Sequence, residues 1–97
     1  MKYSVMLRGE NFEANSENGI VNYGFVTTRV VRAKDLESAE LKAVDLIKND
    51  KSLTDMLIEK PTRTPKIYLE EIYKASWWKR TGGAGYTFWD MDSNTND

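Results

Sequence analysis

The sequence predicts a small α+β domain in which four strands, in the order ββαββ, form a mainly antiparallel sheet with one helix packed on one face. Three observations lead to this prediction: an alternating run at the N-terminus, a long β-branched stretch over residues 20–31, and apolar residues at helical spacing after Asp35. A chain of 97 residues makes one domain. We expect that domain to span residues 1–91, with residues 92–97 as a disordered tail.

The first half of the chain predicts a β-hairpin. Residues 2–8 alternate, with Tyr3, Val5 and Leu7 on one side, which is typical of a strand with one buried face. The segment from Gly9 to Gly19 is rich in Asn, Glu and Ser and predicts a loop. Residues 20–31 then predict a second strand, antiparallel to the first.

A helix is predicted after this hairpin. Asp35 is a suitable N-cap, because its short carboxylate can accept from the free amides of the first turn. We expect Ala39, Ala43 and Leu46 to face the sheet, since they recur at helical spacing. A second N-cap is predicted within residues 52–55, opening a short helical turn.

Two further strands are predicted in the second half of the chain. Residues 66–75 fit either a helix or a strand, and the strand is preferred because a ββαββ chain closes as one sheet under one helix. Residues 86–91 form the last predicted strand, with Tyr86 and Phe88 on one face. We also expect Arg29 to pair with a carboxylate, such as Glu71 across the sheet.

Composition excludes several kinds of function. The chain has no cysteine and no histidine, which removes disulfides, thiolate chemistry and the commonest acid–base and metal-binding side chain. The N-terminus is too short and polar for a signal peptide, and no apolar run approaches the ~20 residues of a membrane span. We therefore expect a cytoplasmic protein that is not an enzyme, needs no cofactor and has no membrane partner.

The main candidate for a binding site is an aromatic and basic segment. Seven of the eleven aromatic residues lie between Tyr68 and Trp89, and no acidic residue occurs from Ile72 to Trp89. Residues 60–89 have a net charge of +4, from six basic and two acidic side chains. The candidate binding residues are Tyr73, Trp77, Trp78, Lys79, Arg80 and Trp89.

This segment has more than one interpretation. Indole and guanidinium planes stack on bases and lysine pairs with phosphate, so Trp77 to Arg80 could hold a nucleotide or a single strand. The favoured interpretation is that the tryptophans fill the core or a subunit contact. A net charge of only −1 argues against binding of duplex DNA, which needs many phosphate contacts.

Two other motifs have plain structural interpretations. Residues 82–85, Gly-Gly-Ala-Gly, lack the pattern of a phosphate-binding loop and predict a flexible hairpin loop. A carboxylate cluster would arise from Glu70, Glu71, Asp90 and Asp92 if the last two strands paired. Solvated charges at the sheet edge are the preferred interpretation of these four residues.

Three runs resemble a known group of proteins. They are residues 7–12 (Leu-Arg-Gly-Glu-Asn-Phe), residues 24–29 (Gly-Phe-Val-Thr-Thr-Arg) and residues 85–88 (Gly-Tyr-Thr-Phe). These runs resemble small uncharacterised bacterial proteins, including those encoded on integron gene cassettes. The resemblance implies a compact α+β fold and provides no activity or functional residue to transfer.

The expected function is therefore a non-catalytic binding or interaction module. An aromatic sheet face that one helix cannot cover favours self-association as a homodimer, because large exposed apolar patches mark interaction sites. A small molecule or another protein is also a possible partner. The alternative is a weak binder of nucleotides or single-stranded nucleic acid that uses the aromatic and basic segment, residues 66–89.

Overall fold

The computed structural model describes residues 1–17, 19–83 and 85–92 of the chain. It contains four strands and two helices, whose bounds are β1 (Lys2–Ser16), β2 (Gly19–Arg32), α1 (Leu36–Lys48), α2 (Lys51–Thr54), β3 (Lys66–Lys74) and β4 (Thr87–Asp90). The four strands form one antiparallel sheet in the order β3-β1-β2-β4. The predicted α+β class with a four-stranded antiparallel sheet is thus confirmed. The element order differs from a single-helix ββαββ chain by the four-residue α2 after α1, a short helical turn that the sequence also predicts.

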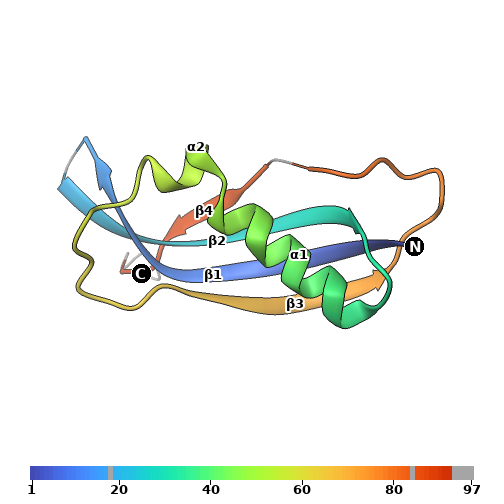
Figure 1. Cartoon of the computed structure of the whole chain (residues 1–97). Coiled ribbons are helices and arrows are strands. Elements are labelled where there is room, and N and C mark those ends of the chain that lie inside the picture. Colours follow the sequence, from blue (N-terminus) through green and yellow to red (C-terminus); the bar gives the residue numbers. More distant parts are fainter. Residues whose placement is uncertain (18, 84, 93–97) are drawn as a thin grey trace, which may run out of the picture.

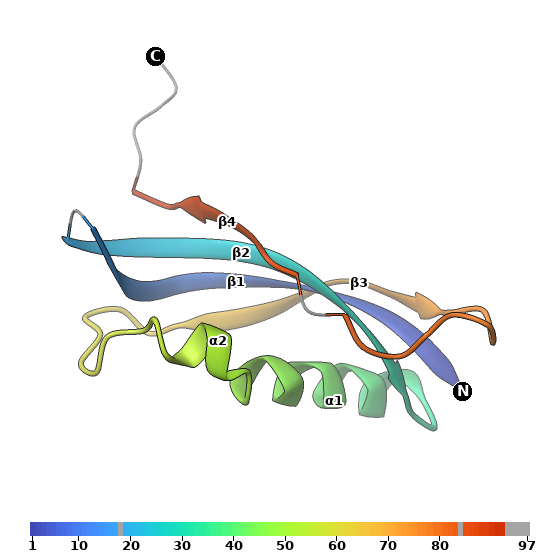
Figure 2. The ribbon, with the colours of Figure 1, turned by 90° about the horizontal axis from the view of Figure 1, so that it is seen from above.

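The molecule has two layers. Figures 1 and 2 show α1 and α2 on one face of the sheet, with no helix on the other face. We call these the helix face and the open face. The long connection between β3 and β4 passes round the end of the sheet where β1 begins, because these two strands lie at opposite edges (Figure 2).

The predicted loop over residues 9–19 is wrong, because β1 continues through it to Ser16. The two long strands pair along almost their whole length, from Lys2 with Arg32 to Ser16 with Gly19. A register shift between Gly9 and Phe12 absorbs the irregular residues, and Asn11 adopts a φ of 64° there. Asparagine tolerates this left-handed conformation, so the polar sequence forms a β-bulge instead of ending the strand.

The core lies between the sheet and α1. Its largest fully buried side chains are Phe25, Leu7, Ile47 and Val5. Ala39 and Ala43 face the sheet as predicted, and both are fully buried. Leu46 does not: its side chain is 45% exposed, whereas the next residue, Ile47, is completely buried. The stripe that faces the sheet is therefore Ala39, Ala43 and Ile47.

The N-cap of α1 is the predicted residue, and the N-cap of α2 is a different residue from the one predicted. Asp35 caps α1 by accepting a hydrogen bond from the amide of Ser38. The cap of α2 is Asp50, which accepts from the amide and the hydroxyl of Ser52, and the prediction of a cap within residues 52–55 is wrong. The short helix begins directly after α1 because Asp50 can cap it immediately.

The last two strands occur where predicted, but they do not form a hairpin. β3 pairs with β1, and β4 pairs with β2. Gly82 exchanges two backbone hydrogen bonds of 2.8 Å with Val30, and so extends the outer edge of β2. Gly82 and Gly83 both have a positive φ, while Ala84 lies outside the described residues. The predicted tail also falls beyond them, except for Asp92.

The open face has a polar centre and aromatic borders. Alternation places Ser4, Met6 and Arg8 of β1 on this face, because Tyr3, Val5 and Leu7 point into the core. Arg8 forms an ion pair with Glu70 at 2.6 Å and lies over the Tyr68 ring. The large exposed aromatic side chains of this face come from the two edge strands: Tyr68 and Tyr73 from β3, and Trp89 from β4.

Candidate functional site

Five of the six predicted binding residues lie at the end of β3, where the chain leaves the sheet. The amide of Ala75 donates to the carbonyl of Lys2, which holds the chain beside β1 for one residue more. The amide of Lys79 then donates to the carbonyl of Ser76, closing a turn around Trp77 and Trp78. The strand therefore ends before the tryptophans, and neither of them occupies a strand position.

Both tryptophans of this turn project into solvent. Trp77 is 85% exposed and Trp78 is 68% exposed, so the interpretation that one of them caps the core of its own chain is wrong. Tyr73, one residue before the end of β3 and opposite Ser4, is 47% exposed. We call Tyr73, Trp77 and Trp78 the aromatic corner.

Lys2 anchors this corner to the sheet. Its Nζ donates to the carbonyl oxygens of Trp77 at 2.8 Å and of Lys79 at 2.6 Å. Lys2 lies on the open face, since it alternates with the buried Tyr3, so the turn is held on the open-face side of the sheet end. Lys79 is half-buried, and Arg80 is exposed.

A basic hollow lies beside the corner. It has a volume of about 440 Å³ and is lined by Met1, Lys2, Arg32, Lys74, Ala75 and Trp77. Among the described residues this lining includes three cations and no carboxylate. The arrangement combines positive charge with an indole surface, which is what a planar anion needs.

Trp89, the sixth predicted binding residue, lies elsewhere. It sits opposite Gly24 on the far edge strand, and a methyl group added to Gly24 would lie 2.6 Å from the indole ring. Three strand spacings separate it from β3, about 14 Å, and six residues along β2 add about 20 Å. Trp89 therefore packs over a glycine at another part of the open face and does not join the aromatic corner.

The possible carboxylate cluster does not form. Glu70 and Glu71 lie on β3, while Asp90 and Asp92 lie at the end of β4 on the opposite edge. Arg63 pairs with Asp92 at 2.9 Å, and Glu70 pairs with Arg8. In the described part of the chain, no group of three or more His, Cys, Asp or Glu residues is placed to hold a metal ion.

A buried polar network on the helix face was not predicted. Arg29 is 3% exposed and points to the helix face, so the predicted pair with Glu71 on the open face is wrong. Its guanidinium instead lies 3.7 Å from Asp50, 5.0 Å from the centre of the Tyr86 ring, and within hydrogen-bond reach of Thr27. The Tyr86 hydroxyl donates to Asp50 at 2.6 Å.

This network links α2 to the connection before β4. The hydrogen bond from Tyr86, with a further one from Ser52, lowers the pKa of the Asp50 carboxyl. Burial raises the pKa of Tyr86 to about 12, and its bond to Asp50 acts in the same direction. Tyr86 thus stays protonated and donates to an ionised carboxylate. We call this network the Asp50 clasp, because it holds α2 against the connection before β4.

A second clasp holds the connection between α2 and β3. The buried carboxylate of Glu13 accepts from the hydroxyl of Thr62 at 2.7 Å and from the Thr62 and Arg63 amides. The hydroxyl bond, with help from these amides, lowers the pKa of Glu13. Both clasps satisfy their buried charges internally, which leaves neither available for acid–base work near neutral pH.

No protein family model, curated protein or solved structure matches this chain. The resemblance to integron cassette proteins therefore stays an expectation. No helix among the described residues is long and apolar enough to cross a membrane.

Proposed function

We propose that this chain is a non-catalytic interaction module that self-associates as a homodimer through the open face, with the aromatic corner at the contact. The observation that supports this most is the exposure of two adjacent tryptophans, 85% for Trp77 and 68% for Trp78. Tryptophan is among the residues most enriched at the energetic centre of protein interfaces.

The size of the exposed surface agrees with this proposal. Large aromatic side chains bury about 150–250 Å² each when covered. At their observed exposures, Tyr73, Trp77 and Trp78 together offer on the order of 400 Å². That is about half of the roughly 800 Å² that each partner buries in a stable complex. The remainder would come from neighbouring open-face residues such as Tyr68.

Solution mass tests the proposal. We expect sedimentation velocity at micromolar to millimolar concentration to show a monomer–dimer equilibrium for the native chain. Replacing both indoles (Trp77→Ser with Trp78→Ser) should weaken the dimer at least tenfold. The control is Leu41→Ser, which removes a 62%-exposed apolar side chain from the outer side of α1. A native chain that stays monomeric, or a dimer lost in the Leu41 variant alone, would contradict the proposal.

The basic hollow supports a second candidate, weak binding of a nucleotide or a single strand. Lys74 and Arg32 are exposed cations beside the Trp77 indole. About three phosphate contacts on a single strand give a slope of only about −2 in log affinity against log salt. We expect quenching of tryptophan fluorescence by a short oligothymidylate to be weak and reduced in Lys74→Gln, with no tight binding to duplex DNA. Quenching that Lys74→Gln leaves unchanged would count against this candidate.

A further inference from the structure

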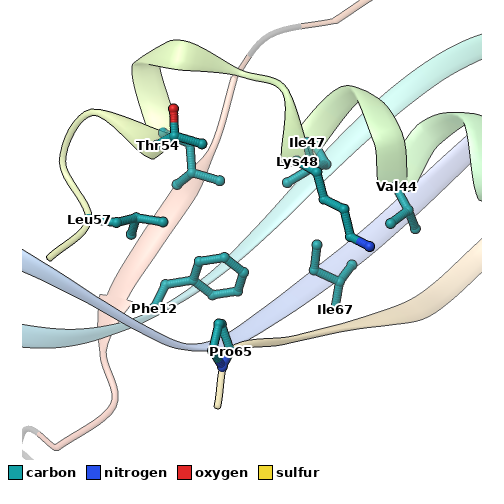
Figure 3. A pocket seen from close by; sticks show the side chains of 9 residues that line it. Phe12, Val44, Ile47, Lys48, Thr54, Leu57, Pro65 and Ile67 are labelled. Atoms are coloured by element: carbon teal, nitrogen blue, oxygen red, sulfur yellow. The ribbon is translucent and has the colours of Figure 1, made fainter. Parts of the chain in front are cut away.

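A second hollow lies on the helix face, remote from the aromatic corner. It has a volume of about 360 Å³ and lies between the end of α1, the short α2 and the strands β1 and β3 (Figure 3). This volume is within the range of sites that hold small organic ligands, about 300–1,000 Å³. The hollow is therefore large enough for a ligand and is not just a packing defect the size of a water molecule.

The lining of this hollow is mostly apolar. Three lining residues, Phe12, Ile47 and Leu53, belong to the buried core, so the floor of the hollow is formed by core side chains. Leu57 and Ile67 are partly buried side chains that pack against the same core and line the hollow from either side of the connection between α2 and β3. Such a surface gains free energy when an alkyl or aromatic group displaces water from it.

One charged side chain lies on this lining. Lys48, in the last turn of α1, extends its alkyl chain over the hollow, and Figure 3 shows its amine on the side of Ile67. None of the ion pairs between described residues involves Lys48. The lining thus combines an apolar interior with a single cation that has no carboxylate partner in the described chain.

We propose that this hollow binds a small amphipathic carboxylate, such as a medium-chain fatty acid. The apolar chain would lie against Phe12 and Ile47, and the carboxylate would pair with the Lys48 amine. One lysine, without a second cation in the lining, suits a singly charged carboxylate better than a phosphate. This site is separate from the aromatic corner, so it does not depend on self-association.

An NMR titration with decanoate tests the proposal. Decanoate, kept below the concentration at which it forms micelles, should shift the resonances of the lining residues Ile47, Leu57 and Ile67 in a saturable way. Decan-1-ol, which has the same chain and no charge, should bind more weakly, and decyltrimethylammonium more weakly still. These differences are expected because only the carboxylate pairs with Lys48.

Three variants complete the experiment. Lys48→Gln should weaken decanoate binding about fivefold, as expected for loss of a partly exposed ion pair, and Lys48→Arg should retain it. Lys51→Gln, which removes a neighbouring exposed lysine outside the lining, should leave it unchanged. Val44→Phe should fill the hollow and abolish binding. Equal binding of decanoate and decan-1-ol, binding unaffected by Lys48→Gln or Val44→Phe, or no shifts at the lining residues would each overturn the proposal.

Discussion

At the scale of single residues, burial in the helix layer depends on which side of α1 faces the sheet. Leu46 and Ile47 are neighbours and equally apolar, yet one is 45% exposed and the other is fully buried. Both fit the apolar stripe in the sequence, because a helix stripe is broad enough to include either of them. Only the position of the sheet against Ala39 and Ala43 determines which of the two enters the core.

This difference predicts unequal losses of stability. Ile47→Ala should lower the free energy of unfolding by about 2–4 kcal/mol, since it removes buried methyl groups and leaves a cavity. Leu46→Ala should cost less than about 1 kcal/mol, because its side chain is already close to half exposed. Urea unfolding at neutral pH measures both values. Equal losses would mean that α1 is rotated from the orientation described.

The Asp50 clasp predicts a dependence of stability on acid. The pKa of the Asp50 carboxyl in the folded chain lies below its ordinary value of 3.8. The stabilisation of the folded chain by this carboxylate is therefore complete above pH 3.8. As the pH falls from 3.8 through the lower folded pKa, the unfolded state takes up the proton first, and the contribution is lost.

Two variants test this dependence. Asp50→Asn and Tyr86→Phe should both reduce the loss of stability between pH 7 and pH 3, measured by urea unfolding, because each removes part of the bond that favours the charged carboxylate. Tyr86→Phe retains the ring that lies against Arg29 and so isolates the hydroxyl. If both variants lost as much stability in acid as the native chain, the clasp would not be the cause.

At the scale of secondary structure elements, the sequence predicts where a strand or helix forms better than it predicts how long that element is. The β-branched and alternating segments became strands, and the apolar stripe became α1. The extension of β1 through residues 9–16 could not be predicted, because Gly9, Asn11 and Asn15 have low β propensity. Pairing with β2 on one side and hydrogen bonds of Glu13 and Asn15 with residues 56–58 on the other override that preference.

The bulge at Asn11 makes this extension possible, and its backbone predicts the effect of substitution. Asn11→Val should destabilise the fold by about 1–3 kcal/mol more than Asn11→Gly, because a β-branched residue is strained at a φ of 64° and glycine is not. Both variants lose the hydrogen bond from Asn22 to the Asn11 side chain, so the comparison isolates the backbone. Thermal unfolding of the pair measures the difference. Equal melting temperatures would show that the strand does not depend on this conformation.

At the scale of the whole molecule, strand order separates residues that are close in sequence. Pairing of the last two strands would have brought Glu71, Asp90, Tyr73 and Trp89 together, and the order β3-β1-β2-β4 places them on opposite edges. No local pattern encodes that order, since it depends on how long connections pass round the sheet. The sequence could single out Tyr73, Trp77 and Trp78 as a group, because they lie within one segment of six residues and their proximity needs no long-range pairing.

The central claim is that copies of this chain meet at the aromatic corner, and an isotope-filtered NOE experiment tests it most directly. An equimolar mixture of ¹³C-labelled and unlabelled chain, at a concentration where the dimer predominates, reveals only contacts between different molecules. We expect intermolecular NOEs to the rings of Tyr73, Trp77 and Trp78. Intermolecular NOEs confined to Leu36, Leu41 and Leu46 on the outer side of α1, or no such NOEs with the diffusion rate of a monomer, would contradict the account.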